Sequence, residues 1–451
     1  MIRATVKQGE RNMRRSSIAA AAAVLVVLGV ALAGVPAGAQ SSSGGSEVGV
    51  TAKTIKVAVI ADVDNTFAPG VLKGIVDGVQ GWGKYVNANG GIAGRKVQVD
   101  FIDSHLNPND TRNAIIKACS EDYALVGTGT LLLQTPADIT SCADSAGTAT
   151  GIPDVAALVT NAAEGCAPTG YAITPPAVQC DTIDQAPQTY RANNGDSKYL
   201  LKQHKDLHGS FVLASDSPSV VKTSKVLNKG AQAAGIKGDS SWNVTANSPQ
   251  SQYTPIIQAM KNDSSNYGLS LQAVTGVVAE RQEAQLQGLT DPNIVWQCTL
   301  ACYQDDAVIK AGDVMNGEYM SLQFLPFDEG SANPMTKNFV KYVGKDNLNG
   351  FASWGFTSGL LFEQAAKAVV QKDGKDGLTR ANLLAQLANI HDFNASGMVA
   401  TTDIGNRTGS ACFMLDQFKS GKFVRVYPTK KGTFDCNKSN IYTFSEDLNS
   451  K

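Results

Sequence analysis

Short apolar runs alternate with helix-type patterns along most of the chain. Ile55 to Ile60 is apolar and rich in β-branched residues, which predicts a strand. After a loop at 62–70, apolar side chains recur at helical spacing until Gly90-Gly91, at Val71, Ile75, Val79, Trp82 and Val86. We expect the next elements to be a strand at 97–103, a helix from about Pro108 to Cys119, and a third strand that ends in the stretch 124–130. Strands that alternate with helices predict an α/β fold whose parallel sheet is covered on both faces.

The same alternation continues through the rest of the chain. Further strands are predicted at 152–158, 211–214, 271–279, 294–297 and 318–324. Further helices are predicted at 220–235, 253–260, 280–289, 333–343, 354–371 and 379–390. Two apolar runs flank Lys419-Ser420-Gly421 and predict a closing β-hairpin.

One turn gives this pattern a recognisable relative. The segment Asn87 to Val97, NANGGIAGRKV, follows a long predicted helix and precedes a strand. With the IKVAVIAD strand at 55–62, it resembles the periplasmic solute-binding proteins of the branched-chain amino acid type, which are the external receptors of ABC importers. The resemblance extends from about Thr51 to Pro428. It implies the type I periplasmic-binding-protein fold: two Rossmann-like lobes, each a parallel sheet covered by helices, joined by a three-strand hinge.

The resemblance also implies a division into lobes, and a length of 451 residues is enough for two domains. Lobe 1 is expected to comprise residues 51–172 and 303–408. Lobe 2 is expected to comprise residues 173–302 and 409–451. The chain would cross between the lobes near Tyr171, again between Cys298 and Tyr303, and a third time between Thr402 and Gly409.

The first 39 residues read as a signal peptide. Five basic residues precede an apolar run at 18–33, and Ala37-Gly38-Ala39 is a typical cleavage site. A retained membrane anchor is the rival interpretation, although the run is short for one. Met13 could be the true start, and Arg14-Arg15 leaves twin-arginine export open beside general secretion. Residues 40–50 form a Ser/Gly-rich linker. We therefore expect an exported protein of the periplasm or cell envelope.

The cysteines agree with export. Their number is eight, and an even number in an exported chain favours disulfides. They fall into four couples that are adjacent in sequence. We expect the bonds to be Cys119–Cys142, Cys166–Cys180, Cys298–Cys302 and Cys412–Cys436.

Charge and motifs argue against several other functions. A net charge of −1 is unlike that of a general nucleic-acid-binding protein. Gly127-Thr-Gly129 lacks the third glycine of a dinucleotide fingerprint, and there is no P-loop and no Gly-x-Ser-x-Gly elbow. His204 and His208 have the spacing of one helical turn, which suits either a metal pair or a solvated helix face. We expect no catalysis, no cofactor and no metal, and we place His204 on the outer surface of lobe 2.

The predicted binding site lies at the carboxyl ends of the strands, where parallel sheets hold their ligands. In the resembled family the loops after the third and fourth strands contact the ligand, and the matching positions here are Thr128, Thr130, Leu131, Ala157 and Thr160. Phe67 matches an aromatic contact. From lobe 2 we expect Ser217, Glu280 and Tyr303 to face them. For the Thr and Ser positions, ordinary turn or cap chemistry is the alternative.

Two departures from the family pattern bear on the solute. The loop after the third strand contains Leu131-Leu132-Leu133 where hydroxyl residues are usual. No acidic residue lies between Cys298 and Cys302 to meet an ammonium group. The expected ligand is therefore a small polar or partly apolar solute, such as an amino acid or a related compound. The expected partner is an ABC permease, with the chain acting as a monomer; a sensor of the same fold and a secreted hydrolase are the alternatives.

Overall fold

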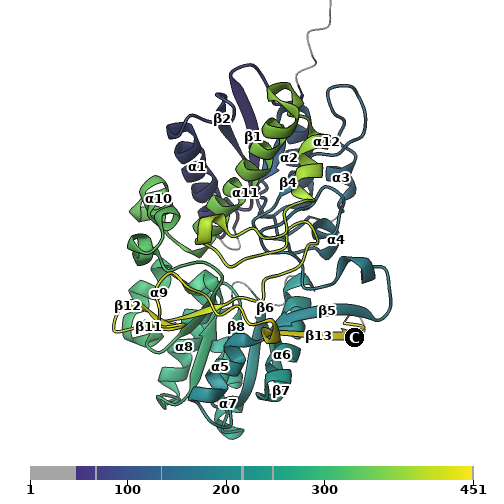
Figure 1. Cartoon of the computed structure of the whole chain (residues 1–451). Coiled ribbons are helices and arrows are strands. Elements are labelled where there is room, and N and C mark those ends of the chain that lie inside the picture. Colours follow the sequence, from purple (N-terminus) through teal and green to yellow (C-terminus); the bar gives the residue numbers. More distant parts are fainter. Residues whose placement is uncertain (1–46, 67–68, 134, 215–217, 246–247, 449–451) are drawn as a thin grey trace, which may run out of the picture. The chain divides into compact units, whose positions relative to one another are not determined.

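The computed structural model describes residues 47–66, 69–133, 135–214, 218–245 and 248–448 (Figure 1). The predicted signal peptide and most of the predicted linker lie outside the described residues. Within the described ranges, no helix is long and apolar enough to cross a membrane.

The first half is built on a four-stranded parallel sheet in the order β2-β1-β3-β4. Its strands are β1 (Thr54–Ala61), β2 (Lys96–Asp103), β3 (Ala124–Val126) and β4 (Asp154–Val155). Alternate residues of β1 face opposite sides: Val57 and Val59 enter one apolar cluster, and Ala58 and Ile60 enter another. Both faces of the sheet are therefore buried at β1, as the apolar run predicts.

Helices cover both faces. The face that carries Val57 and Val59 packs against α1 (Lys73–Ala88) and α11 (Gly350–Asp373). The other face packs against α2 (Pro108–Glu121), which Asn107 caps by accepting hydrogen bonds from the amides of Asn109 and Asp110. Smaller helices complete this half: α3 (Ala137–Thr140), α4 (Ala162–Gly165), α10 (Pro334–Val343) and α12 (Arg380–Leu387).

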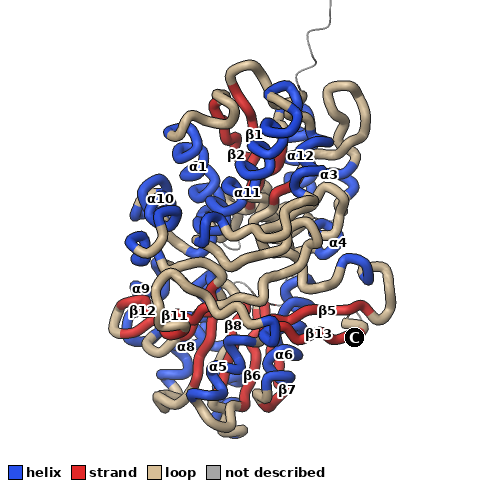
Figure 2. The backbone as a smooth tube through the Cα atoms, viewed as in Figure 1, coloured by secondary structure: helices blue, strands red, loops and turns tan. Residues whose placement is uncertain are grey.

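The second half is built on a seven-stranded sheet (Figure 2). Its strands, in spatial order, are β12 (Lys422–Tyr427), β11 (Met414–Lys419), β10 (Tyr319–Leu322), β9 (Val295–Cys298), β8 (Tyr267–Leu271), β6 (His208–Ala214) and β7 (Lys237–Val244). The strands from β7 to β10 are parallel, and β11 and β12 form the predicted hairpin around Ser420-Gly421. The helices of this half are α5 (Gly195–Gln203), α6 (Pro218–Ala234), α7 (Thr254–Asn262), α8 (Val274–Leu286) and α9 (Asp306–Ala311).

The position of β10 differs from the expectation. We expected the strand at 318–324 to complete lobe 1, but β10 pairs with β9 and β11 in the seven-stranded sheet. The segment from Tyr303, with α9, is the crossover of a βαβ unit whose two strands are β9 and β10. The chain therefore returns to the first half after Leu322, not near Tyr303.

A separate two-stranded sheet was not predicted. It pairs β5 (Gln188–Asn193) with β13 (Ile441–Glu446) in antiparallel register. Tyr190 of β5 stacks on Phe444 of β13, with 5.4 Å between the ring centroids. All four predicted disulfides are present. The predicted α/β fold class is confirmed.

Candidate functional site

Asp62 organises the edge where the strands of the first sheet end. Its side chain is fully buried directly after β1. Oδ1 accepts hydrogen bonds from the Ser104 hydroxyl at 2.6 Å and the Leu106 amide at 3.0 Å, and Oδ2 accepts from the Leu131 amide at 2.7 Å. The loops that follow β1, β2 and β3 are thereby joined through one carboxylate.

The structure brings together the five residues predicted from the loops after β3 and β4. The Thr128 carbonyl accepts from the amide of Ala157 at 3.0 Å, and the Thr160 hydroxyl donates to the Thr130 carbonyl at 3.3 Å. Leu131 joins them through its bond to Asp62 and is half-buried. Their clustering agrees with parallel-sheet topology, and their contact with a solute stays a prediction.

The Thr128 hydroxyl has an internal partner. It donates to Oδ1 of Asp154 at 2.6 Å, and Thr128 itself is 2% exposed. Asp154 lies near Glu164, and both carboxyl groups are buried. Burial raises the pKa of Asp154 to about 7, and burial together with the charge of Asp154 raises the pKa of Glu164 well above its usual value. The pair is therefore held at least partly protonated near neutral pH.

Glu280 is buried within α8 rather than exposed at an open edge. Its Oε2 accepts hydrogen bonds from the Ser270 hydroxyl and from Nε2 of Gln272. Gln272 in turn accepts from the Tyr253 hydroxyl at 2.6 Å. Burial raises the pKa of Glu280 to about 7. This carboxyl belongs to a polar network inside the second half, and its predicted contact with a solute stays a prediction.

Tyr303 is enclosed by aromatic rings and is 1% exposed. Its ring contacts those of Phe324, Phe327 and Phe423, and its hydroxyl accepts from the Phe327 amide at 3.1 Å. Burial raises the pKa of the Tyr303 hydroxyl above its usual value. In this conformation the Tyr303 hydroxyl is held by the backbone amide of Phe327, which follows the second crossing between the halves.

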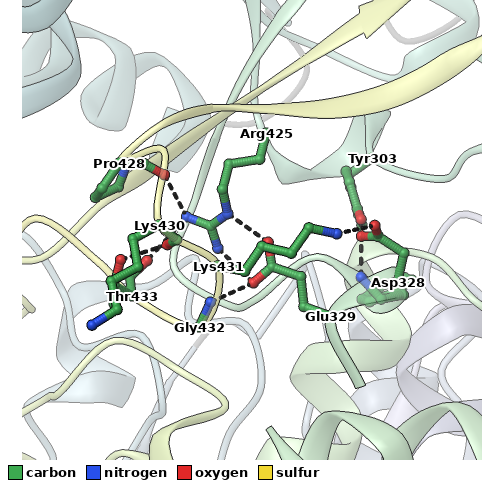
Figure 3. A network of polar contacts seen from close by, with 10 residues as sticks. Tyr303, Asp328, Glu329, Arg425, Pro428, Lys430, Lys431, Gly432 and Thr433 are labelled. Atoms are coloured by element: carbon green, nitrogen blue, oxygen red, sulfur yellow. Dashed lines mark hydrogen bonds and ion pairs between the residues drawn. The ribbon is translucent and has the colours of Figure 1, made fainter. Parts of the chain in front are cut away.

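A buried ion pair lies beside Tyr303 (Figure 3). Arg425 of β12 holds both carboxylate oxygens of Glu329, with 2.5 Å between Nε and Oε1 and 2.8 Å between Nη2 and Oε2. Arg425 also donates to the carbonyls of Pro428 and Thr433, and Glu329 accepts from the Gly432 amide. This network fixes the loop after β12 against the segment after the second crossing.

Two predicted site residues, Phe67 and Ser217, lie outside the described residues. Sequence reasoning also missed Trp354, in the first turns of α11. Trp354 and Thr357 line a cavity of about 20 Å³ with Ile173-Thr174, Gln323-Phe324 and residues 399, 400 and 402. Three segments connect the two halves, and each contributes one of these groups: 173–174, 323–324, or 399, 400 and 402. A Trp that follows Phe351 in a mostly apolar helix reads as core, so the pattern alone gave no signal for it.

The two histidines do not form a metal pair. His204 follows the end of α5 and His208 begins β6, so they are not on one helix. His204 is half-buried, with its Nε2 3.4 Å from the Tyr319 hydroxyl, and burial lowers its pKa. It lines an open hollow of about 450 Å³ with Tyr199, Tyr319 and Gln417. Among the described residues, no three His, Cys, Asp or Glu side chains come together as a metal site would need.

Comparison with known proteins gives a consistent set of relatives. A family model described as periplasmic binding protein matches residues 54–422. No curated protein matches the chain in sequence. Similar solved structures include an ABC transporter substrate-binding protein from Aeropyrum pernix, which is 16% identical in sequence and gives a TM-score of 0.64. The alignment covers 86% of this chain and 97% of that one.

Two further similar structures are of proteins whose ligands are specified. A fatty acid ABC transporter substrate-binding protein from Thermomonospora curvata is 14% identical in sequence and gives a TM-score of 0.63. The alignment covers 86% of this chain and 98% of that one. A solute-binding protein from R. palustris in complex with 4-hydroxybenzoate is 14% identical with a TM-score of 0.61, and 88% of this chain covers 99% of it. At these identities the likeness shows the fold alone.

Proposed function

We propose that this chain, which belongs to the periplasmic binding protein family, is exported, captures a small solute between its two halves and delivers it to an ABC importer. The family and the fold support the class of function. The observation that carries the proposal is the cavity lined by all three connecting segments and by Trp354. A solute held there would touch the segments about which the halves can rotate.

The proposed mechanism is hinge closure. The cavity of about 20 Å³ has room for about one water molecule, so a solute can enter only if the connecting segments allow the halves to separate. A solute that contacts both halves binds the closed state better than the open one and shifts the population towards it. The permease would then recognise the closed form.

The proposed lobes follow from the sheets. Lobe 1 would comprise residues 51–172 with the segment from about 326 to 400. Lobe 2 would comprise residues 173–322 and the segment from about 409 onward. This division keeps β10 with its partners β9 and β11 and moves the second crossing to Gln323–Leu325.

The relatives leave the solute class open. Two similar structures belong to a fatty acid transporter and to a complex with 4-hydroxybenzoate. An α-amino acid is therefore not required by the fold, and a partly apolar solute is compatible with the three consecutive leucines at 131–133.

A thermal-shift screen of the mature protein tests the proposal. The panel should contain amino acids, amides, ureas and short organic acids. A ligand at about one hundred times its Kd stabilises the native state by roughly 2.7 kcal/mol, which raises the melting temperature measurably. A confirmed ligand should also reduce the radius of gyration measured by X-ray scattering. A panel without any binder, or a binder that leaves the radius unchanged, would contradict the proposal.

A further inference from the structure

The walls of the hinge cavity are neutral. Every side chain that lines it is either apolar, such as Ile173 and Val399, or uncharged and polar, such as Thr174, Gln323 and Thr402. In the described part of the chain, no Lys, Arg, Asp, Glu or His side chain lines this space. Moving an isolated ionised group into such surroundings costs several kcal/mol, because neither water nor a counter-ion replaces its hydration.

Two buried carboxylates described above, those of Asp62 and Glu280, do not line this cavity. Asp62 is fully buried and already accepts three hydrogen bonds. Glu280 is 1% exposed and accepts two hydrogen bonds through Oε2 inside its own half, while its buried Oε1 has no hydrogen-bond partner among the described residues. An ammonium group in the cavity would therefore meet no carboxylate on the cavity wall.

Two polar groups on the cavity wall do have free hydrogen-bonding capacity. Among the described residues, neither the indole N–H of Trp354 nor the side-chain amide of Gln323 has a hydrogen-bond partner. The indole can donate, and the amide can both donate and accept. The ring of Trp354, which is only half-buried, also offers a flat apolar surface.

We infer that the solute is uncharged and planar, with an amide-like head that accepts from Trp354 and pairs with Gln323. The inference rests on the proposed function, and it names the solute class for that same site. A zwitterionic α-amino acid is the wrong class, because neither its ammonium group nor its carboxylate would find an oppositely charged side chain on the cavity wall. A carboxylate anion is the wrong class for the same reason.

Three compounds of similar size test whether the site prefers an uncharged solute. Benzamide is neutral, benzoate is an anion and phenylglycine is a zwitterion, and each carries one phenyl ring. Calorimetric titration of the mature wild-type protein should give a Kd for benzamide at least about tenfold lower than for the other two, since an unpaired buried charge costs well over 1.4 kcal/mol.

A pair of tryptophan variants tests the placement. Trp354→Phe keeps an aromatic ring and removes the N–H, and it should weaken benzamide several-fold, up to about tenfold. Trp242→Phe is the matched control: its buried indole N–H also has no partner, but Trp242 lies on β7 and lines no part of this cavity. It should leave the affinity unchanged. Melting curves of both variants confirm that they fold.

The outcomes of these experiments distinguish the inferred solute class from the proposed function on which it rests. Tighter binding of benzoate or phenylglycine than of benzamide overturns the solute class and leaves the solute-binding function standing. An unchanged benzamide affinity in Trp354→Phe overturns the placement. Absence of binding by all three and by the whole screening panel overturns the proposed function, and the inference falls with it. If only the screen yields a ligand, a neutral one supports the inference and a charged one overturns it.

Discussion

Arg380 holds several backbone segments together from a single buried position at the start of α12. It is fully buried, and its guanidinium donates to the carbonyls of Cys119, Asp122 and Ala143 at 2.7–2.8 Å. Its own amide donates to the side chain of Glu47 at 3.0 Å. Arg380 therefore supplies hydrogen-bond donors to three backbone carbonyl groups, of which that of Asp122 is buried.

Replacing Arg380 should destabilise the fold strongly. Arg380→Met keeps most of the volume but leaves the three carbonyls without donors, and we expect the free energy of unfolding to fall by roughly 3–5 kcal/mol. Urea denaturation followed by circular dichroism measures this. Arg112→Met is the control, because the Arg112 side chain is 65% exposed and its ion pair with Asp138 should contribute less than about 1 kcal/mol. Similar losses in both variants would contradict the prediction.

Thr128 gives a second prediction. Because its hydroxyl donates to the buried Asp154, Thr128→Val should lower the free energy of unfolding by about 1–3 kcal/mol. The same change at Thr443, an exposed residue of β13, should stay within about 0.5 kcal/mol. Both values come from urea denaturation at pH 7. A Thr128→Val protein as stable as the wild type would show that the hydrogen bond to Asp154 is not needed.

At the scale of elements, the pairing of α1 with α11 depends on glycines. A Cβ at Gly355 would lie 2.0 Å from the carbonyl oxygen of Ile75, and a Cβ at Gly359 would lie 2.2 Å from the ring of Trp82. Trp82 also donates to Glu363 of α11 at 3.0 Å. The two helices are therefore closer than side chains at these positions would permit.

Gly359→Ala tests this close approach. In an exposed helix the change would favour the helix by up to about 1 kcal/mol. Here the added methyl group must displace Trp82, and we expect a net loss of roughly 1–3 kcal/mol in the free energy of unfolding. Lys84→Ala, on the exposed side of α1, is the control and should change little. Stabilisation by Gly359→Ala would mean that the helices can move apart at no cost.

Elements were predictable from the sequence where the pattern is local. The apolar run of β1, the spacing of apolar residues in α1 and the hairpin at Ser420-Gly421 each identify themselves within a short stretch of chain. The sheet to which β10 belongs is decided by its partners β9 and β11, and β11 lies far beyond it in the chain. The pairing of β5 with β13 joins segments that are still farther apart. No local pattern contains this information.

At the scale of the whole molecule, buried acids dominate the expected response to pH. Mainly through burial, the pKa values of Asp122, Asp154, Glu280 and Asp416 are raised to about 7, and that of Glu318 to about 8. In the unfolded chain the pKa values of these carboxyl groups are about 4. The folded state therefore binds more protons than the unfolded state between these limits, and its stability falls as the pH rises through 7 to 8.

The melting temperature should accordingly be higher at pH 5 than at pH 8.5. Each such carboxyl changes the free energy of unfolding by at most about 1.4 kcal/mol per pH unit. Asp122→Asn removes one of these groups and should make the decline shallower, while Asp206→Asn, at an exposed residue, should leave it unchanged. A melting temperature that rises from pH 5 to 8.5 would contradict the prediction.

The candidate site was predictable only in part. Thr128, Thr130 and Ala157 cluster because strand topology places the ends of β3 and β4 at one edge. Sequence could not show that the Thr128 hydroxyl is occupied by Asp154, since the two residues meet only through strand pairing. Nor could it distinguish Trp354 from a core residue, because the cavity arises from three connecting segments that are far apart in the chain.

The pairing of β5 with β13 has a consequence for the order in which the chain is synthesised and folds. Thr189 and Ser445 face each other across this sheet although 256 positions separate them in the chain. A chain that emerges from its amino end exposes the edge of β5 until nearly the last strand has followed. The second half therefore cannot complete this two-stranded sheet until the carboxyl end of the chain has been synthesised, so its last folding step follows translation.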